Sequence, residues 1–271
     1  EATDAVVGDD NNGSVQIEDG GFADINGPVV VGASAGSDGE ITVTGRNANN
    51  AQSALDVFSN MTIGDAGTGR LLIRDGSRVD SNDVYLGNSL GGRGTLTVEG
   101  GLASGSARLV AGGLFAYRGD VFINRGGSMS ATNALIGNGA TSSVTVTGAG
   151  VAGDPGRWIA LGTTTLGDNA EMILNINEGG VVDASSLFVG QQVGGRGRIN
   201  LSSTNPAERS QFLASDFVFL GGNSLGPGGL AELTLNQNST AIFRDTTTIY
   251  LGSSVTLNSP SSHLIADAIF N

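Results

Sequence analysis

The stretch MTIGDAGTGRLLIRDGSRVD, residues 61–80, decides the fold. It holds three short apolar segments, at Met61-Thr62-Ile63, at Leu71-Leu72-Ile73 and at Val79, and glycine-rich turns separate them. Apolar residues that alternate in such short runs have the period of two expected for strands. The many glycines also interrupt the 3.6-residue apolar pattern that an amphipathic helix would need. The stretch therefore predicts three short strands joined by sharp turns.

The same plan returns along the whole chain. An apolar segment that ends in glycine recurs at intervals of 24, 32, 23, 25, 25, 30, 23, 31 and 31 residues. A repeat of about 20–50 residues is typical of stacked units, none of which can close a core alone. Three short strands in each repeat favour an all-β fold, a parallel β-helix (β-solenoid) of about ten coils. The ten glycines are Gly8, Gly32, Gly64, Gly87, Gly112, Gly137, Gly167, Gly190, Gly221 and Gly252.

The sequence also contains a second, longer repeat. Residues 41–98 match residues 144–201 without a gap, with 17 identities in 58 positions and an offset of 103 residues. The match aligns Gly64-Asp65 with Gly167-Asp168, and it selects Leu166-Gly167 over Leu161-Gly162 as the repeat position. The sequence thus predicts a four-coil internal duplication within a single domain that spans residues 1–271.

Composition narrows the possible functions. The chain has 271 residues, of which 45 are glycine, and it carries 26 acidic and 13 basic residues, all arginine, for a net charge of −13. The absence of cysteine excludes disulfides and cysteine zinc sites. The negative charge argues against nucleic acid, and no apolar run is long enough for a membrane helix. No signal segment opens the chain, so we expect a mature region or a fragment.

Several motifs resemble the passenger-associated repeat of Gram-negative autotransporters. They are Val144-Thr145-Val146-Thr147-Gly148-Ala149-Gly150 with Trp158, Leu166-Gly167-Asp168, Glu178-Gly179-Gly180-Val181-Val182, and the run from Val84 to Gly101. The resemblance covers roughly residues 29–200. It implies a right-handed β-helix at the outer surface of a Gram-negative bacterium, secreted through an outer-membrane barrel. The family's signal peptide and C-terminal barrel are not among these residues.

One tripeptide suggests receptor binding. Arg118-Gly119-Asp120 has the sequence through which an exposed loop bridges an integrin's acidic pocket and its metal ion. The apolar Val121-Phe122-Ile123 follows directly, so the tripeptide is expected at a turn that enters a strand. Chance occurrence is the competing interpretation, because the chain is rich in all three residue types.

Acidic residues suggest a second candidate site. Asp24, Asp56 and Asp80 lie seven or eight residues before consecutive repeat glycines, so they are expected to form a column with steps of about 5 Å. Such a column could cap turns, bind a cation or supply a glycosidase's pair of carboxyls. Arg78 is the nearest basic residue, and no arginine is expected to repeat beside the column. Asp183 and Asp245 occupy similar positions in distant repeats.

Nucleophilic catalysis has little support in the sequence. The only histidine, His263, would share a strand face with Asp267, but about 13 Å away along the strand. Asp9, Asp65, Asn88, Asn138 and Asp168 follow repeat glycines, where a positive φ would suit Gly, Asn and Asp alike. The sequence therefore names no catalytic, cofactor-binding or metal-binding residue.

The leading hypothesis is a non-enzymatic extracellular β-solenoid that acts as an adhesin or a structural stalk. Its partners would be a host or neighbouring cell surface, or an extracellular polymer. A second hypothesis is a self-assembling subunit of a filament or sheath, because uncapped solenoid ends expose strand edges. A lesser one is a polysaccharide-degrading enzyme or a domain similar to a phage tail spike.

Overall fold

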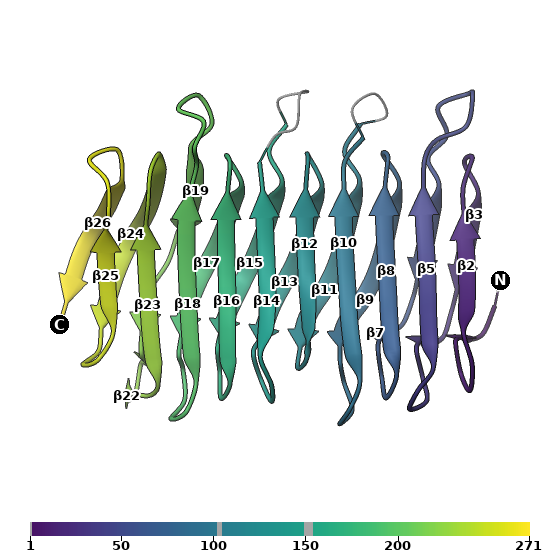
Figure 1. Cartoon of the computed structure of the whole chain (residues 1–271), viewed down its shortest axis with the longest axis horizontal. Helices are drawn as coiled ribbons and strands as arrows, with labels where there is room; N and C mark the ends of the chain where they lie inside the picture. Colours follow the sequence, from purple (N-terminus) through teal and green to yellow (C-terminus); the bar gives the residue numbers. More distant parts are fainter. Residues whose placement is uncertain (1, 102–104, 149–153) are drawn as a thin grey trace.

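The computed structural model describes residues 2–101, 105–148 and 154–271, and within these ranges it contains strands and no helix. Two long parallel sheets run the length of the molecule, and neighbouring strands of each sheet come from successive passes of the chain (Figure 1). The chain is an all-β parallel solenoid, as the repeats predicted.

The first sheet has ten strands in chain order. They are β2 (Gly13–Ile17), β5 (Asp38–Thr44), β8 (Thr68–Arg74), β10 (Arg93–Glu99), β12 (Gly119–Asn124), β14 (Ser142–Thr147), β16 (Glu171–Asn177), β18 (Arg196–Ser202), β23 (Leu230–Leu235) and β25 (Ser254–Leu257). We call it the ten-stranded sheet.

The second sheet has fourteen strands and bends around the core. They are β1 (Ala5–Val7), β3 (Phe22–Ile25), β4 (Val29–Val31), β6 (Ala54–Val57), β7 (Met61–Ile63), β9 (Arg78–Leu86), β11 (Arg108–Ala116), β13 (Ser128–Ile136), β15 (Arg157–Leu166), β17 (Val181–Val189), β19 (Ser210–Ala214), β20 (Val218–Leu220), β24 (Ser239–Ile249) and β26 (His263–Phe270). Two short strands, β21 (Gly222–Asn223) and β22 (Gly226–Pro227), form a separate antiparallel pair.

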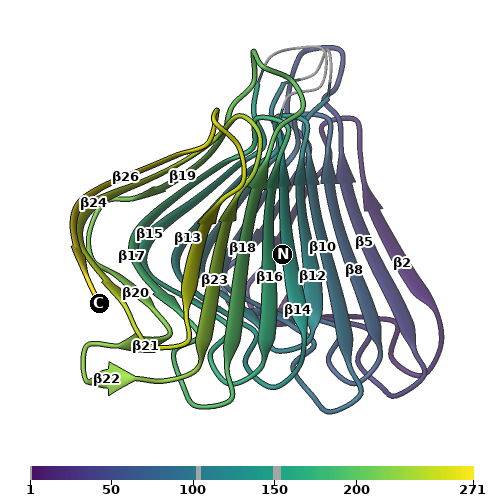
Figure 2. The same ribbon diagram turned by 60° about the vertical axis from the view of Figure 1, so that its left-hand side comes forward.

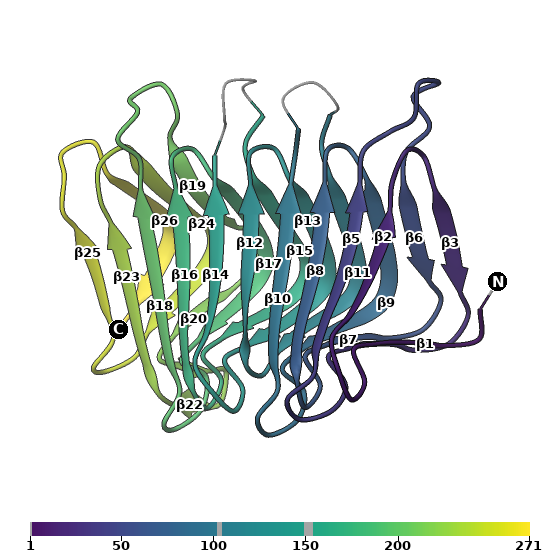
Figure 3. The same ribbon diagram turned by 45° about the vertical axis from the view of Figure 1, so that its right-hand side comes forward.

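The expected three strands per repeat are seen most clearly near the N-terminus. There β3 and β6 pair with each other, while β1, β4 and β7 form a separate run of pairs (Figure 3). Strand β9 then pairs with both β6 and β7, because its nine residues pass through the bend without a break. From β9 onward the second and third segments of most repeats are one bent strand.

The two sheets face each other across the interior (Figure 2), and the buried side chains point inward from both. Along β10, Leu96 and Val98 are fully buried while Thr95 and Thr97 face outward, which is the alternation that the sequence predicted. The buried side chains form one hydrophobic cluster that extends from Val7 to Phe243. Each pass of the chain therefore adds a layer to a continuous apolar interior.

The pairing register corrects two of the ten repeat positions. Leu86 pairs with Ala116, so Tyr117 rather than Gly112 follows the strand end, and Leu220 pairs with Ile249, so Tyr250 rather than Gly252 does. Both predictions were wrong because a nearby apolar-glycine pair imitated the motif. The choice of Leu166 is confirmed, since it pairs with Ile136.

The corrected register shows that the first eight intervals alternate between short and long; the ninth stays long because the β21–β22 pair lies between β20 and β23. The intervals become 24, 32, 23, 30, 20, 30, 23, 31 and 29 residues. In the shorter passes three or four residues connect the ten-stranded sheet to the bent sheet, as between β8 and β9. In the longer passes seven to nine residues do so, as in the projecting connections after β5 and β18 (Figure 1).

The tight connections use a left-handed backbone. Asp75-Gly76 has φ values of 51° and 78°, and Glu178-Gly179 has 47° and 85°. A non-glycine residue in this region costs roughly 1 kcal/mol or more, which the surrounding pairing must offset. Equivalent pairs begin at Asp19 and Arg125. The two-pass alternation is thus built by alternating a tight turn with a loop.

Candidate functional site

The predicted acidic column is present on the outer face of the bent sheet. Asp24 on β3 pairs in register with Asp56 on β6, and Asp56 pairs with Asp80 on β9. On β11 the equivalent residue is Val110, where the column ends. Parallel pairing places neighbouring strands about 4.8 Å apart, so the three carboxylates follow one another along the solenoid axis.

Arginine neutralises part of this charge. The Nη2 of Arg78 donates to both carboxylate oxygens of Asp56 at 2.8 Å, and its Nη1 lies 3.2 Å from Asp80 Oδ2. Arg108 pairs in register with Arg78, so two arginines stand in succession beside the column. The expectation that no arginine repeats there was wrong, because the misplaced repeat at Gly112 hid the register of β11.

Burial, together with the neighbouring charges, raises the pKa of Asp56. Burial raises the pKa of its carboxyl above the ordinary 3.8; Asp80 and Asp24 raise it further, whereas Arg78 opposes them. One oxygen of Asp24 and one of Asp80 (Oδ1 in each) are shielded from solvent and have no hydrogen-bond partner. Each of these two carboxylates therefore has one oxygen that is neither hydrogen-bonded nor exposed to solvent.

We expect Asp56→Asn to be at least as stable as the wild type at about pH 7, although it breaks an ion pair. Because the folded-state pKa is raised, the native protein keeps its proton to a higher pH than the unfolded chain does. Stability is therefore lost as pH rises from 3.8 through the folded pKa, and asparagine avoids this loss. Urea unfolding of both proteins at about pH 3 and pH 7 measures it.

Glu232→Gln is the control, because the pKa of Glu232 is shifted in the opposite direction to that of Asp56. Hydrogen bonding from Arg196 lowers the pKa of Glu232 below the ordinary 4.5, against the effect of burial. Its contribution is present above 4.5 and is lost as pH falls through the folded pKa. This variant should be less stable than the wild type at about pH 7 and equal to it at low pH. An Asp56→Asn protein that is clearly destabilised at pH 7 would contradict the prediction.

A shallow groove adjoins the column. It has a volume of about 420 Å³ and spans β6, β9, β11 and β13. Gly112 on β11 keeps the floor low: a Cβ there would lie 2.5 Å from the carbonyl oxygen of Asn82. The remaining lining residues are Asp56, Val57, Phe58, Asp80, Ser81, Asn82, Val110, Ala111 and Thr132.

Sequence reasoning did not single out Phe58, Asn82 or Thr132. A signal was available, since Phe58 and Asn82 each follow an aspartate of the column by two residues and a strand brings such pairs to one face. Thr132 could be found only from the register that pairs β11 with β13. The groove is thus largely a product of the stacking.

The other acidic candidates lie apart from the groove. Asp183 on β17 is 3.3 Å from Arg157 Nη2, and Asp245 accepts a hydrogen bond from the Thr246 hydroxyl at 3.2 Å. His263 and Asp267 are exposed on β26. Within the described ranges, no group of three or more His, Asp or Glu side chains is arranged to hold a metal ion.

The Arg118-Gly119-Asp120 tripeptide lies at the start of β12 rather than on a projecting loop. Gly119 is buried and Asp120 is within the strand. The Asp120 carboxylate contacts Arg93, and its Oδ1 accepts a hydrogen bond from the Ser143 hydroxyl at 2.6 Å. Receptor binding by the tripeptide stays a prediction, and it would require these contacts to break.

We expect Asp120→Ala to lower the free energy of unfolding by about 1 kcal/mol, because it removes a partly exposed ion pair and a hydrogen bond. Cell attachment should not change. Urea unfolding and an attachment assay on integrin-bearing cells measure the two effects. Attachment lost by both Asp120→Ala and the conservative Asp120→Glu, while both variants stay folded, would instead support receptor binding.

The acidic residues after the repeat glycines join successive passes. The positive φ belongs to the glycines, for example 71° at Gly64 and 72° at Gly167, while the residues after them do not share it. Asp65 Oδ1 accepts hydrogen bonds from Asn88 and Ser89, and the buried Asp168 accepts two from Gln192 at 3.0 Å. The proposed reason for aspartate there was therefore wrong: it acts through its side chain.

Comparison with models of known protein families, with curated proteins and with solved structures gave no match. No helix in the described ranges is long and apolar enough to span a membrane.

Proposed function

We propose that the chain is a non-enzymatic extracellular β-solenoid, an autotransporter-like passenger that acts as an adhesin or a structural stalk. In this proposal the solenoid is a right-handed parallel β-helix of about ten coils. It would lie at the outer surface of a Gram-negative bacterium. The sequence resemblance over residues 29–200 supports the family assignment.

The observation that carries the proposal is the unbroken stack of parallel strands around one apolar core. Ten strands spaced about 4.8 Å apart make a rod on the order of 45 Å long. Such a rod holds whatever its surface carries at a fixed distance from its base. Side-chain bonds between passes, such as Gln192 to Asp168, add to its rigidity.

Reading the gene beyond the codon for Asn271 tests the autotransporter assignment. A downstream segment of about 250–300 residues with alternating strands and a terminal aromatic residue would be an outer-membrane barrel and would support it. An early stop, or an anchoring or sorting tail, would contradict it. Small-angle scattering and an experimental structure would check the rod length, the coil count and the handedness.

The C-terminal edge favours self-assembly as a second candidate. The core-facing residues there are only partly covered: Leu257 is 49% exposed and Ile269 is 50% exposed. In their own sheets β25 and β26 each pair on one side only. A second copy could add its first strands to this edge. Sedimentation of the purified chain tests this, and monomers at high concentration would contradict it.

Polysaccharide degradation remains a lesser alternative, because two carboxyls on adjacent strands could form a glycosidase pair. Depolymerisation assays with Asp56→Asn and Asp80→Asn test it. Activity in the wild type that both variants lose would establish it, and no activity on acidic or neutral polysaccharides would count against it.

A further inference from the structure

We infer that the groove beside the acidic column binds a neutral polysaccharide, with one chain lying along the solenoid axis. The inference goes beyond the proposed function, since a stalk needs no ligand. It rests on the shape of the groove, on its accessible polar groups, on one exposed aromatic ring and on its charges.

The shape suits a linear chain. The groove crosses four successive strands, from β6 to β13, which at about 4.8 Å per step gives a length of roughly 14 Å along the axis. Its volume of about 420 Å³ lies within the range of small-ligand sites. Because Gly112 carries no side chain, the floor stays open between Asn82 and Thr132.

The polar groups in and beside the groove include both hydrogen-bond acceptors and hydrogen-bond donors. Asp80 lines the groove with its side chain 36% exposed, and because Oδ1 is shielded, Oδ2 is the acceptor that a ligand can reach beside Arg78. The amide nitrogen of Asn82 donates to the Phe58 carbonyl at 2.9 Å, which leaves the amide oxygen available. Arg108 lies beside them on β11, exposed and without an ion pair in the described part of the chain. Sugar hydroxyls donate and accept at once, so they match such a mixed set.

Phe58 offers a free ring face. Several aromatic rings elsewhere on this sheet cover one another, as where Tyr85 stacks on Phe115 with centroids 5.0 Å apart. Phe58 makes no ring contact with another aromatic in the described part of the chain, and it is 60% exposed at the end of the groove. The negative face of an aromatic ring attracts the weakly positive C–H groups of a sugar ring.

The charges point to a neutral chain. Four carboxylates lie in or beside the groove, at Asp24, Asp56, Asp80 and Asp83, against the two guanidinium groups of Arg78 and Arg108. The small negative excess disfavours a polyanion, and the ion pairs of Arg78 with Asp56 and Asp80 leave little unpaired charge for a polycation. Hydroxyl hydrogen bonds and ring stacking then decide what binds.

Isothermal titration of the purified chain with defined hexasaccharides tests the inference. The neutral probes are cellohexaose, mannohexaose and N-acetylchitohexaose; hexagalacturonic acid and the chitosan hexamer are the anionic and cationic probes. At least one neutral probe should bind, and Phe58→Ala and Asp80→Asn should each weaken it by about tenfold or more. Phe270→Ala is the matched control, since Phe270 is 57% exposed at the C-terminal end, and it should bind as the wild type does.

Circular dichroism and Trp158 fluorescence would verify that each variant is folded. The inference is overturned if no neutral probe binds, if only a charged probe binds, or if the Phe58 and Asp80 variants bind as well as the wild type. Because the assay uses the purified chain alone, a negative result leaves the proposed role as an extracellular scaffold standing.

Discussion

Gly64→Ala is expected to destabilise the protein by about 2–5 kcal/mol. Gly64 has a φ of 71°, where a side chain adds roughly 1–2 kcal/mol of strain. A Cβ there would also lie 2.0 Å from the carbonyl oxygen of Arg93 and 2.3 Å from its carbonyl carbon. Both atoms belong to the backbone of the next pass, so relief requires the two passes to separate, and overpacking of this kind typically costs about 1–3 kcal/mol more.

Gly45→Ala separates the two causes. Gly45 has a similar φ of 78°, but no atom lies within 4 Å of the place that its Cβ would take. This variant should lose only the strain energy, about 1–2 kcal/mol. Urea unfolding followed by circular dichroism, with hydrogen exchange to locate the loss, measures both variants. Equal losses in the two variants would show that contact between passes does not set the cost at Gly64.

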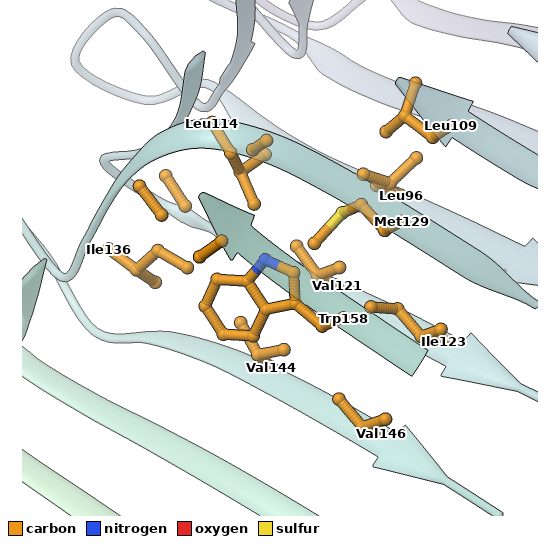
Figure 4. Close-up of a cluster of buried hydrophobic side chains, with 14 of the residues drawn as sticks. Leu96, Leu109, Leu114, Val121, Ile123, Met129, Ile136, Val144, Val146 and Trp158 are labelled. Carbon is orange, nitrogen blue, oxygen red and sulfur yellow. The ribbon is translucent and has the colours of Figure 1, made fainter. Parts of the chain in front are cut away.

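Trp158→Ala should lower the free energy of unfolding by a comparable amount, about 3–5 kcal/mol, because it removes the largest buried side chain of the core and leaves a cavity. Trp158 is fully buried on β15, and Figure 4 shows its indole among Val121, Met129, Ile136 and Val144. Neighbouring strands are held by their own pairing and cannot collapse into the space. The cavity should therefore persist.

Trp158→Phe separates the contribution of side-chain packing from that of the buried indole N–H group. The indole Nε1 is buried without a hydrogen-bond partner, so replacing it removes a donor that folding leaves unsatisfied. We expect the phenylalanine variant to lose no more than about 1.5 kcal/mol, since the smaller cavity is partly offset by that gain. Urea unfolding monitored by circular dichroism gives both values. A loss as large as that of the alanine variant would indicate that Nε1 is bonded in solution.

The sequence was sufficient for the fold class because each repeat carries its own strand pattern. The alternation in Leu96-Thr97-Val98 fixes which side chains enter the core, and the glycines mark sharp turns. The acidic column was also predictable, since stacked repeats bring equivalent positions together. Asp24, Asp56 and Asp80 needed only approximate spacing to be placed on adjacent strands.

The sequence pattern did not determine the pairing register between successive strands. An apolar residue before glycine occurs at Ala111-Gly112 as well as at repeat ends, and only the pairing of Leu86 with Ala116 decides between the alternatives. That one assignment hid the alternation of long and short passes, the position of Arg108 beside the acidic column and the floor of the groove. Similarly, only the packing shows that the Asp120 carboxylate contacts Arg93 and Ser143.

The sequence by itself therefore determined that this chain is a parallel solenoid with an apolar interior and an acidic column. The tertiary structure alone decided the two-pass alternation, the partners of each charge and the groove. The physical reason is that strand pattern is a local property with a period of two residues. The identity of a neighbour in the next pass, by contrast, depends on the length of each intervening turn, and a change of a few residues there moves every later side chain to a new partner.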